Sequence, residues 1–202
     1  MSIRIALSAA AMTVVMTQAA SAAMITFTNN TLWSGFVASQ GKTVAPETFN
    51  SYNGYYVSGL SGNAGGIQWT ASAPGNLYAD LGYMSTNNPS ETLTFTLSPS
   101  VQGVAGNFFG TDQSFGILPA IIGVQLADGS SYVGYAASAA DFVGFYSTGA
   151  SISSISVTAS NVSGTQSIYA TVDNLYFAVV PAPGAVALLG LAGLVSGARK
   201  RR

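Results

Sequence analysis

The sequence predicts an all-β fold, a single antiparallel β-sandwich of jelly-roll or related topology over residues 24–179. From residue 91 onward, strand-like segments recur about every ten to fifteen residues, which is typical of such sandwiches. Turn-forming Gly, Asn, Ser and Pro separate these segments, and no amphipathic helical pattern lies between them. The chain has no Cys and therefore no disulfides, so packing or a metal must stabilise the fold.

The first half is predicted to contain short strands joined by long loops. Residues 24–28 form the first strand, with Ile25 and Phe27 on one face. Across residues 29–90, turn-forming residues interrupt the chain at short intervals, and aromatic residues recur between the interruptions. No repeat and no long linker divides the chain, which indicates one domain.

The second half has the clearest strand patterns. Residues 91–97 read ETLTFTL, which places Leu93, Phe95 and Leu97 on a buried face and the threonines on the other face. The pair Asp128-Gly129 predicts a hairpin turn between strands at 120–127 and 131–136. The other predicted strands are 101–109, broken by Gly103 and Gly106, then 142–146, 152–158 and 167–179.

Residues 1–23 are predicted to be a secretory signal peptide. Arg4 opens a short basic region, residues 5–16 are mostly apolar, and Ala20-Ser21-Ala22 provides small residues at a cleavage position. We therefore expect the chain to be exported.

Residues 180–202 form a three-part C-terminal tail. The tail starts with Val180, Pro181, Ala182 and Pro183, has no charge over 184–198, and ends in the basic cluster Arg199, Lys200, Arg201 and Arg202. A helix over 184–198 is roughly 22 Å long, and residues 179–183 bring the segment close to the ~30 Å hydrocarbon core. The pattern predicts a marginal transmembrane helix whose basic end stays cytoplasmic.

This tail resembles the PEP-CTERM sorting tail of bacterial exported proteins, which has Pro-Glu-Pro, a short apolar helix and an Arg-rich end. Pro181 and Pro183 match the prolines, residues 188–194 match the helix, and Ala182 replaces the glutamate. The resemblance implies an exosortase-type processing enzyme, an inner-membrane-anchored precursor, and a final location in the cell envelope or outside the cell. A related sortase that accepts the variant motif, or an anchor that is never cut, is the alternative.

Residues 106–174 resemble, more loosely, a domain common in PEP-CTERM proteins. The matching features are a Gly-Phe strand ending in Thr111-Asp112, the Asp128-Gly129 hairpin, and a last strand with Asp173-Asn174. This resemblance implies a lectin-like sandwich and no particular activity.

The charge distribution restricts the partners. Between the two ends, Lys42 is the one basic residue against seven acidic residues, so the formal charge of this part is −6. Nucleic acid is excluded as an expected partner, because binding it requires cations against phosphate. A divalent cation or a neutral polymer fits better.

Catalysis is not expected. The chain has no His and no Cys, which excludes Ser-His-Asp and Cys-His nucleophile sites and the usual zinc sites. Glu47 and Glu91 are its only glutamates, and nothing in the sequence pairs them as a glycosidase requires.

Asp173 and Asn174 interrupt an otherwise apolar strand, which makes them candidate metal ligands. With Asp112 or Asn107 they would offer the oxygen ligands that calcium prefers, so calcium is the one cofactor considered. The alternative is a β-bulge or a strand-end cap in which Asp173 binds backbone amides.

Aromatic residues in the first half suggest a ligand surface. Tyr52, Tyr55, Tyr56 and Trp69, together with Tyr78, are candidates for a platform on which sugar rings stack, and burial in the core is the alternative. The expected function is that of a non-enzymatic exported envelope or extracellular-matrix protein sorted by its tail. The alternative is a carbohydrate-binding module that recognises exopolysaccharide, with or without calcium.

Overall fold

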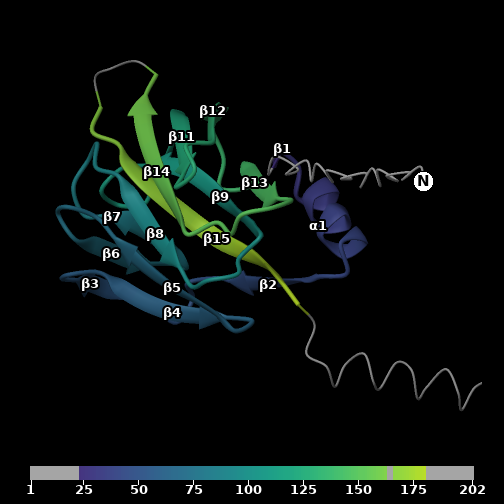
Figure 1. Cartoon of the computed structure of the whole chain (residues 1–202). Helices are drawn as coiled ribbons and strands as arrows, with labels where there is room; N and C mark the ends of the chain where they lie inside the picture. The colour runs from purple at the N-terminus through teal and green to yellow at the C-terminus, as the bar shows by residue number, and fades with distance from the viewer. Residues whose placement is uncertain (1–22, 163–165, 181–202) are drawn as a thin grey trace, which may run out of the picture.

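A computed structural model describes residues 23–162 and 166–180, which fold into two antiparallel β-sheets packed face to face (Figure 1). The all-β prediction is therefore confirmed. Residues 1–22 of the predicted signal peptide and residues 181–202, which hold the predicted sorting motif after Val180, the helix and the basic cluster, lie outside the described residues. Within the described ranges, no helix is both long and apolar enough to cross a membrane.

The larger sheet, called sheet A here, has nine strands among the described residues. Their order is β1-β13-β9-β15-β7-β6-β3, with β10 added to β9 and β2 added to β15. The strands are β1 (Met24–Phe27), β2 (Thr43–Glu47), β3 (Gly54–Tyr56), β6 (Leu77–Asp80), β7 (Tyr83–Thr86), β9 (Gly103–Thr111), β10 (Ile117–Leu118), β13 (Phe142–Ser147) and β15 (Tyr169–Val179).

The second sheet, sheet B, has the order β12-β11-β14-β8-β5-β4. Its strands are β4 (Leu60–Ala64), β5 (Ile67–Ser72), β8 (Leu93–Leu97), β11 (Ala120–Leu126), β12 (Ser131–Ala136) and β14 (Ser154–Asn161). The predicted hairpin is confirmed, since the Leu126 amide donates to the Ser130 carbonyl at 2.8 Å and Gly129 supplies the required positive φ of 88°.

The core lies between the two sheets. On β8, Leu93 and Phe95 are fully buried and Thr96 is exposed, so the alternation predicted for this strand is confirmed. Phe95 packs against Phe49 and Trp69, with ring centroids 6.1 Å apart in both pairs. One face of sheet B packs against this core, and the other face is in contact with solvent. Ser and Thr dominate the solvent-facing side of the sheet, including Thr70, Thr96 and Thr158.

The predicted break of a strand at Gly106 is wrong. β9 begins at Gly103 and runs unbroken through Gly106, and all nine of its residues are buried because both of its faces are covered. A Cβ on Gly103 would lie 2.7 Å from the Cβ of Ala178 on the neighbouring strand β15. Gly103, at the start of β9, therefore permits close packing against β15.

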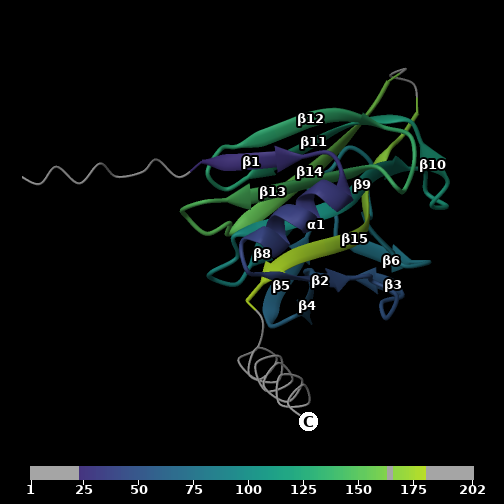
Figure 2. The same cartoon turned by 90° about the vertical axis from the view of Figure 1, so that its right-hand side faces the viewer.

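A helix also occurs where short strands and loops were predicted. α1 (Asn30–Ser39) begins after Asn29, whose side chain accepts a hydrogen bond from the Leu32 amide at 3.0 Å. Its buried residues Trp33 and Val37 are four apart and therefore share one helical face. Figure 2 shows α1 against the outer face of sheet A, near β13 and β15.

Trp33 fixes this helix to the sheet. Its ring is fully buried, and its Nε1–H donates to the Phe145 carbonyl at 3.2 Å. A small second core forms around it from Val37, Ala105, Tyr146 and Ala178. α1 thus closes one half of the outer face of sheet A and leaves the other half available for a site.

Candidate functional site

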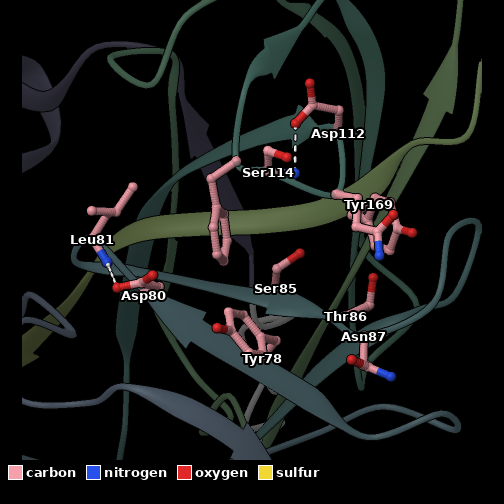
Figure 3. Close-up of a pocket in the computed structure, with 11 residues that line it drawn as sticks. Tyr78, Asp80, Leu81, Ser85, Thr86, Asn87, Asp112, Ser114 and Tyr169 are labelled. Carbon is pink, nitrogen blue, oxygen red and sulfur yellow. Dashed lines mark hydrogen bonds between the residues drawn. The ribbon is translucent and has the colours of Figure 1, made fainter.

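The uncovered half of the outer face of sheet A contains a cavity of about 410 Å³, called the Tyr78 cavity here. Residues of β6 and β7 and the loop 112–116 line it, together with Tyr169 at the start of β15. In Figure 3, Tyr78 and Ser85 lie on one side of the cavity, and Asp112 and Ser114 lie on the other. Its volume falls within the range of roughly 300–1,000 Å³ that is usual for small-molecule sites.

The strand register brings these distant residues together. Tyr55 pairs with Tyr78, Tyr78 with Ser85, Ser85 with Thr171, and Thr171 with Phe109. Directly opposed residues in antiparallel strands share one face of a sheet. Their neighbours Leu77, Met84 and Val172 point into the core, so this row lies on the outer face.

Buried hydroxyls make the floor beneath the cavity rigid. Thr111 and Thr171 share a hydrogen bond of 2.8 Å between their side-chain oxygens, and the Thr171 hydroxyl donates to Ser85 at 3.0 Å. The Ser85 hydroxyl in turn donates to the Ala170 carbonyl at 3.3 Å. Each of these side chains is almost completely buried, so the chain of hydroxyls satisfies groups that would otherwise be costly to bury.

The loop opposite the strands is held by Asp112. Its Oδ1 accepts hydrogen bonds from the amides of Ser114 at 2.8 Å and Gly116 at 2.7 Å. This turn places the Phe115 ring 5.9 Å from both Tyr78 and Tyr83. Asp112 therefore acts here as an anchor for the loop that closes the cavity.

Two bulky residues at the cavity have strained backbones. Phe115 has a φ of 61° and Leu81 a φ of 56°, in the left-handed region that large side chains rarely adopt. Leu81 is also 73% exposed, although it is apolar. Strain of this kind persists where surrounding contacts enforce it and is frequent at binding sites.

Several polar groups at the cavity remain available to a ligand. Among the described residues, the side chains of Tyr78, Asn87 and Gln113 form no hydrogen bond. The Thr86 hydroxyl is buried without a partner in this part of the chain, but Thr86 pairs with the core residue Leu77 and so lies on the inner face of β7.

The predicted calcium ligands do not come together. Asp173 and Asn174 form the predicted β-bulge, because the pairing of β15 with β9 shifts between Val172 and Leu175. Asn174 approaches the Asn107 side chain at 3.5 Å. Asp112 lies five residues further along the chain than Asn107, roughly 17 Å at about 3.4 Å per residue. Asp112 is therefore not a ligand of this site, and the described residues contain no group of three acidic side chains able to hold a metal.

Asn107 has a structural role at this bulge. Its side-chain nitrogen donates to the carbonyls of Ala140 at 3.2 Å and Asp141 at 3.4 Å. Its oxygen accepts the Tyr176 hydroxyl at 3.3 Å. These bonds connect the loop before β13 to the centre of sheet A and use the oxygen that a cation would need.

Asp173 is expected to destabilise the protein at neutral pH. Burial raises the pKa of its carboxyl, so the folded state binds the proton more tightly than the unfolded state. The contribution of Asp173 to the free energy of unfolding is therefore highest below about pH 3.9, the pKa of the carboxyl in the unfolded state. It falls as the pH rises through the higher pKa of the folded state. We predict that Asp173→Asn raises the melting temperature at pH 7 and that the gain disappears near pH 3. Thermal melts at both pH values, in calcium and in chelator, test this; a calcium-dependent rise in the wild-type melting temperature would contradict it.

The predicted aromatic platform is wrong for Trp69. Its ring is 1% exposed, and its Nε1–H donates to Glu47 Oε2 at 3.1 Å. Tyr52 packs edge-on against it at 5.8 Å, so both rings belong to the core region. A ring enclosed on all sides cannot stack on a sugar.

The other two tyrosines differ from each other. The Tyr56 hydroxyl accepts a hydrogen bond from the Asn53 amide at 3.1 Å and is held at the edge of sheet A. Tyr55 is 52% exposed and lies directly opposite Tyr78. Of the predicted platform, Tyr78 lines the cavity and Tyr55 lies beside it on the neighbouring strand, while Phe115, whose ring packs against Tyr78, was not predicted.

Both glutamates have structural partners. Glu47 Oε1 accepts from the Phe49 amide at 3.0 Å, in addition to the bond of its other oxygen to Trp69. Glu91 accepts from the Gly75 amide at 2.9 Å and from Asn88 Nδ2 at 3.1 Å. Neither glutamate lines the Tyr78 cavity.

No protein family, no curated protein and no solved structure matches this chain.

Proposed function

We propose that this chain is a non-enzymatic exported protein whose β-sandwich binds carbohydrate in the Tyr78 cavity and whose C-terminal tail sorts it to the cell envelope or extracellular matrix. The observation that carries the binding function is the combination of Tyr78 and Phe115 with uncommitted polar groups in one cavity of about 410 Å³. Sugar rings present apolar C–H faces and polar edges, which match aromatic faces and nearby amides and hydroxyls.

The chemistry of the cavity supports binding over catalysis. A glycosidase requires two carboxyl groups on either side of the scissile bond, one with a raised pKa. The acidic residues that line this cavity are Asp80 and Asp112. In each of them Oδ1 is already bonded to backbone amides, at 2.7–2.8 Å, and serves to position a turn. Without His and Cys, the chain also has none of the usual nucleophile activators.

Carbohydrate binding is tested by substitution of Tyr78. Full-length protein is first screened against a glycan array, and the affinity for a positive glycan is then measured by calorimetry. Tyr78→Ala removes the stacking ring and is expected to weaken binding at least about tenfold, or about 1.4 kcal/mol, while Tyr78→Phe keeps most of the affinity.

Tyr135→Ala is the matched control for this experiment. Tyr135 is 60% exposed and lies on β12 in the other sheet, so its removal should leave the affinity unchanged. Equal losses in the Tyr78 and Tyr135 variants, or no loss in either, would place the bound glycan outside the Tyr78 cavity.

The sorting function rests on the C-terminal tail. Pro181, Pro183 and the apolar segment 184–198 precede four basic residues, an order that retains a precursor in the inner membrane with its basic end cytoplasmic. Val179 still pairs with Thr43, so the tail follows directly after a paired strand. Replacement of Arg199, Lys200, Arg201 and Arg202 by neutral residues should weaken membrane retention and processing. Unchanged fractionation and unchanged processing of this variant would refute the proposal.

A further inference from the structure

Two cavities adjoin on the outer face of sheet A. Beside the Tyr78 cavity lies a second cavity of about 340 Å³, lined by Leu118, Gln166 and Ser167 among others. Asp112, Gln113 and Tyr169 line both cavities. The two hollows therefore meet at these three residues and form one track that runs from β6 past loop 112–116 to the start of β15. An elongated ligand fits such a track better than a compact one does.

The charge along the track has one sign. Among the described residues, Asp80 and Asp112 are the charged residues that line the two cavities, and neither cavity is lined by Lys or Arg. The Asp80 carboxylate is fixed at the rim, because its Oδ1 accepts from the Leu81 amide and from Asn53 Nδ2, both at 2.8 Å. Lys42, the one basic residue between residues 23 and 180, lies beyond α1, which covers the other half of the sheet.

An anionic ligand is disfavoured at such a site. A carboxylate or sulfate on a sugar would lose hydration on entering the track, and no cation would compensate for that loss. It would also be repelled by Asp80 and Asp112. A neutral sugar has no such cost, and its hydroxyls match the uncommitted groups on Tyr78, Asn87 and Gln113.

We propose that this track binds the interior of an uncharged polysaccharide chain and discriminates against polymers of uronic acids. The proposal rests on the carbohydrate-binding function and adds two properties to it. The first is selection by charge, imposed by Asp80 and Asp112. The second is recognition of a chain of several sugars, imposed by the continuation of the Tyr78 cavity beyond Tyr169.

Matched oligosaccharides test both properties. The probes are the β-1,4-linked hexamers of glucose and of mannose, the hexamers of glucuronate and mannuronate with the same linkage, and the free monosaccharides. Calorimetry with the full-length protein should show binding of at least one neutral hexamer. The matching uronate hexamer and the monosaccharide should each bind at least about tenfold more weakly.

A charge variant separates repulsion from shape. Asp80→Asn keeps an oxygen acceptor for the Leu81 amide and removes the negative charge. The difference in affinity between the neutral hexamer and the uronate hexamer should therefore become smaller. Tyr78→Ala should weaken binding of both hexamers, because the ring contacts either chain.

The outcomes distinguish this inference from the function on which it rests. Tighter binding of a uronate hexamer that is lost in Tyr78→Ala would leave carbohydrate binding intact and overturn the charge selection. Equal affinity for the monosaccharide and the hexamer would overturn recognition of a chain. Binding that is unaffected by Tyr78→Ala would remove the track as the site, and the absence of binding to every probe would overturn the carbohydrate-binding function together with the inference.

Discussion

Phe95→Ala is expected to destabilise the protein by about 3–5 kcal/mol, the usual cost of removing a fully buried phenylalanine ring from a core. Phe95 is fully buried on the central strand β8 and packs against Phe49 and Trp69. These rings are held in turn by the bond between Trp69 and Glu47 Oε2, so the surrounding structure has little freedom to fill the space. For a domain of this size, each kcal/mol lowers the melting temperature by roughly 2–4 °C.

Thr96→Ala is the control for this substitution. Thr96 lies on the same strand, one residue away, and points to the exposed face of sheet B. Its replacement should change stability by about 0.5 kcal/mol or less. Similar denaturant midpoints for the two variants would show that the face of β8 assigned to the core is wrong.

Trp33→Ala is expected to cost a similar amount, about 3–5 kcal/mol, by detaching α1 from sheet A. The Trp33 ring is fully buried against Ala105, and its Nε1–H is bonded to the Phe145 carbonyl at 3.2 Å. The substitution leaves a cavity and also leaves that carbonyl with one bond fewer. Thermal or denaturant unfolding measures the loss.

Leu32→Ala on the same helix provides the comparison. Leu32 is 67% exposed, so its removal should have little effect on stability. Because α1 lies on the half of sheet A away from the Tyr78 cavity, carbohydrate binding by Trp33→Ala should be preserved at temperatures where that variant remains folded. Equal stability of the two helix variants would contradict the role assigned to Trp33.

Local patterns in the sequence predicted the parts of the fold that depend on neighbours along the chain. The alternation in residues 91–97 identified the buried face of β8, since a period of two directly reports which side chains face the core. Asp128-Gly129 identified a hairpin, because a tight turn requires residues that accept positive φ. The β-bulge at Asp173-Asn174 was one of two alternatives offered for that pair.

The parts that were missed depend on contacts between distant segments. α1 has only two buried residues, Trp33 and Val37, so its helical period is too short to stand out from a Gly- and Ser-rich sequence. The unbroken strand β9 was divided because glycine was interpreted as a terminator, whereas its small size serves close packing against β15. Trp69 was assigned to a surface because its partner Glu47 lies 22 residues away.

Tyr78 was among the predicted aromatic candidates, but the rest of the candidate site was hidden for the same reason. Tyr78, Ser85 and Thr171 meet only through the register of β6, β7 and β15, which the sequence does not specify. The left-handed conformation of Phe115 follows from the bonds that Asp112 makes to Ser114 and Gly116. An aspartate followed four residues later by glycine is a recognisable turn signal, but it does not show what the turn covers.

The most direct test of the carbohydrate site is a nuclear magnetic resonance titration of the isotopically labelled protein with a neutral hexasaccharide that binds it. We predict that the largest backbone amide shift changes occur within residues 78–87 and 112–116, the two segments that contain most of the residues lining the Tyr78 cavity. We further predict small changes in α1 and on the outer face of sheet B. Shift changes concentrated on β12, on α1 or on the Ser- and Thr-rich face of sheet B, with residues 78–87 unaffected, would contradict this prediction.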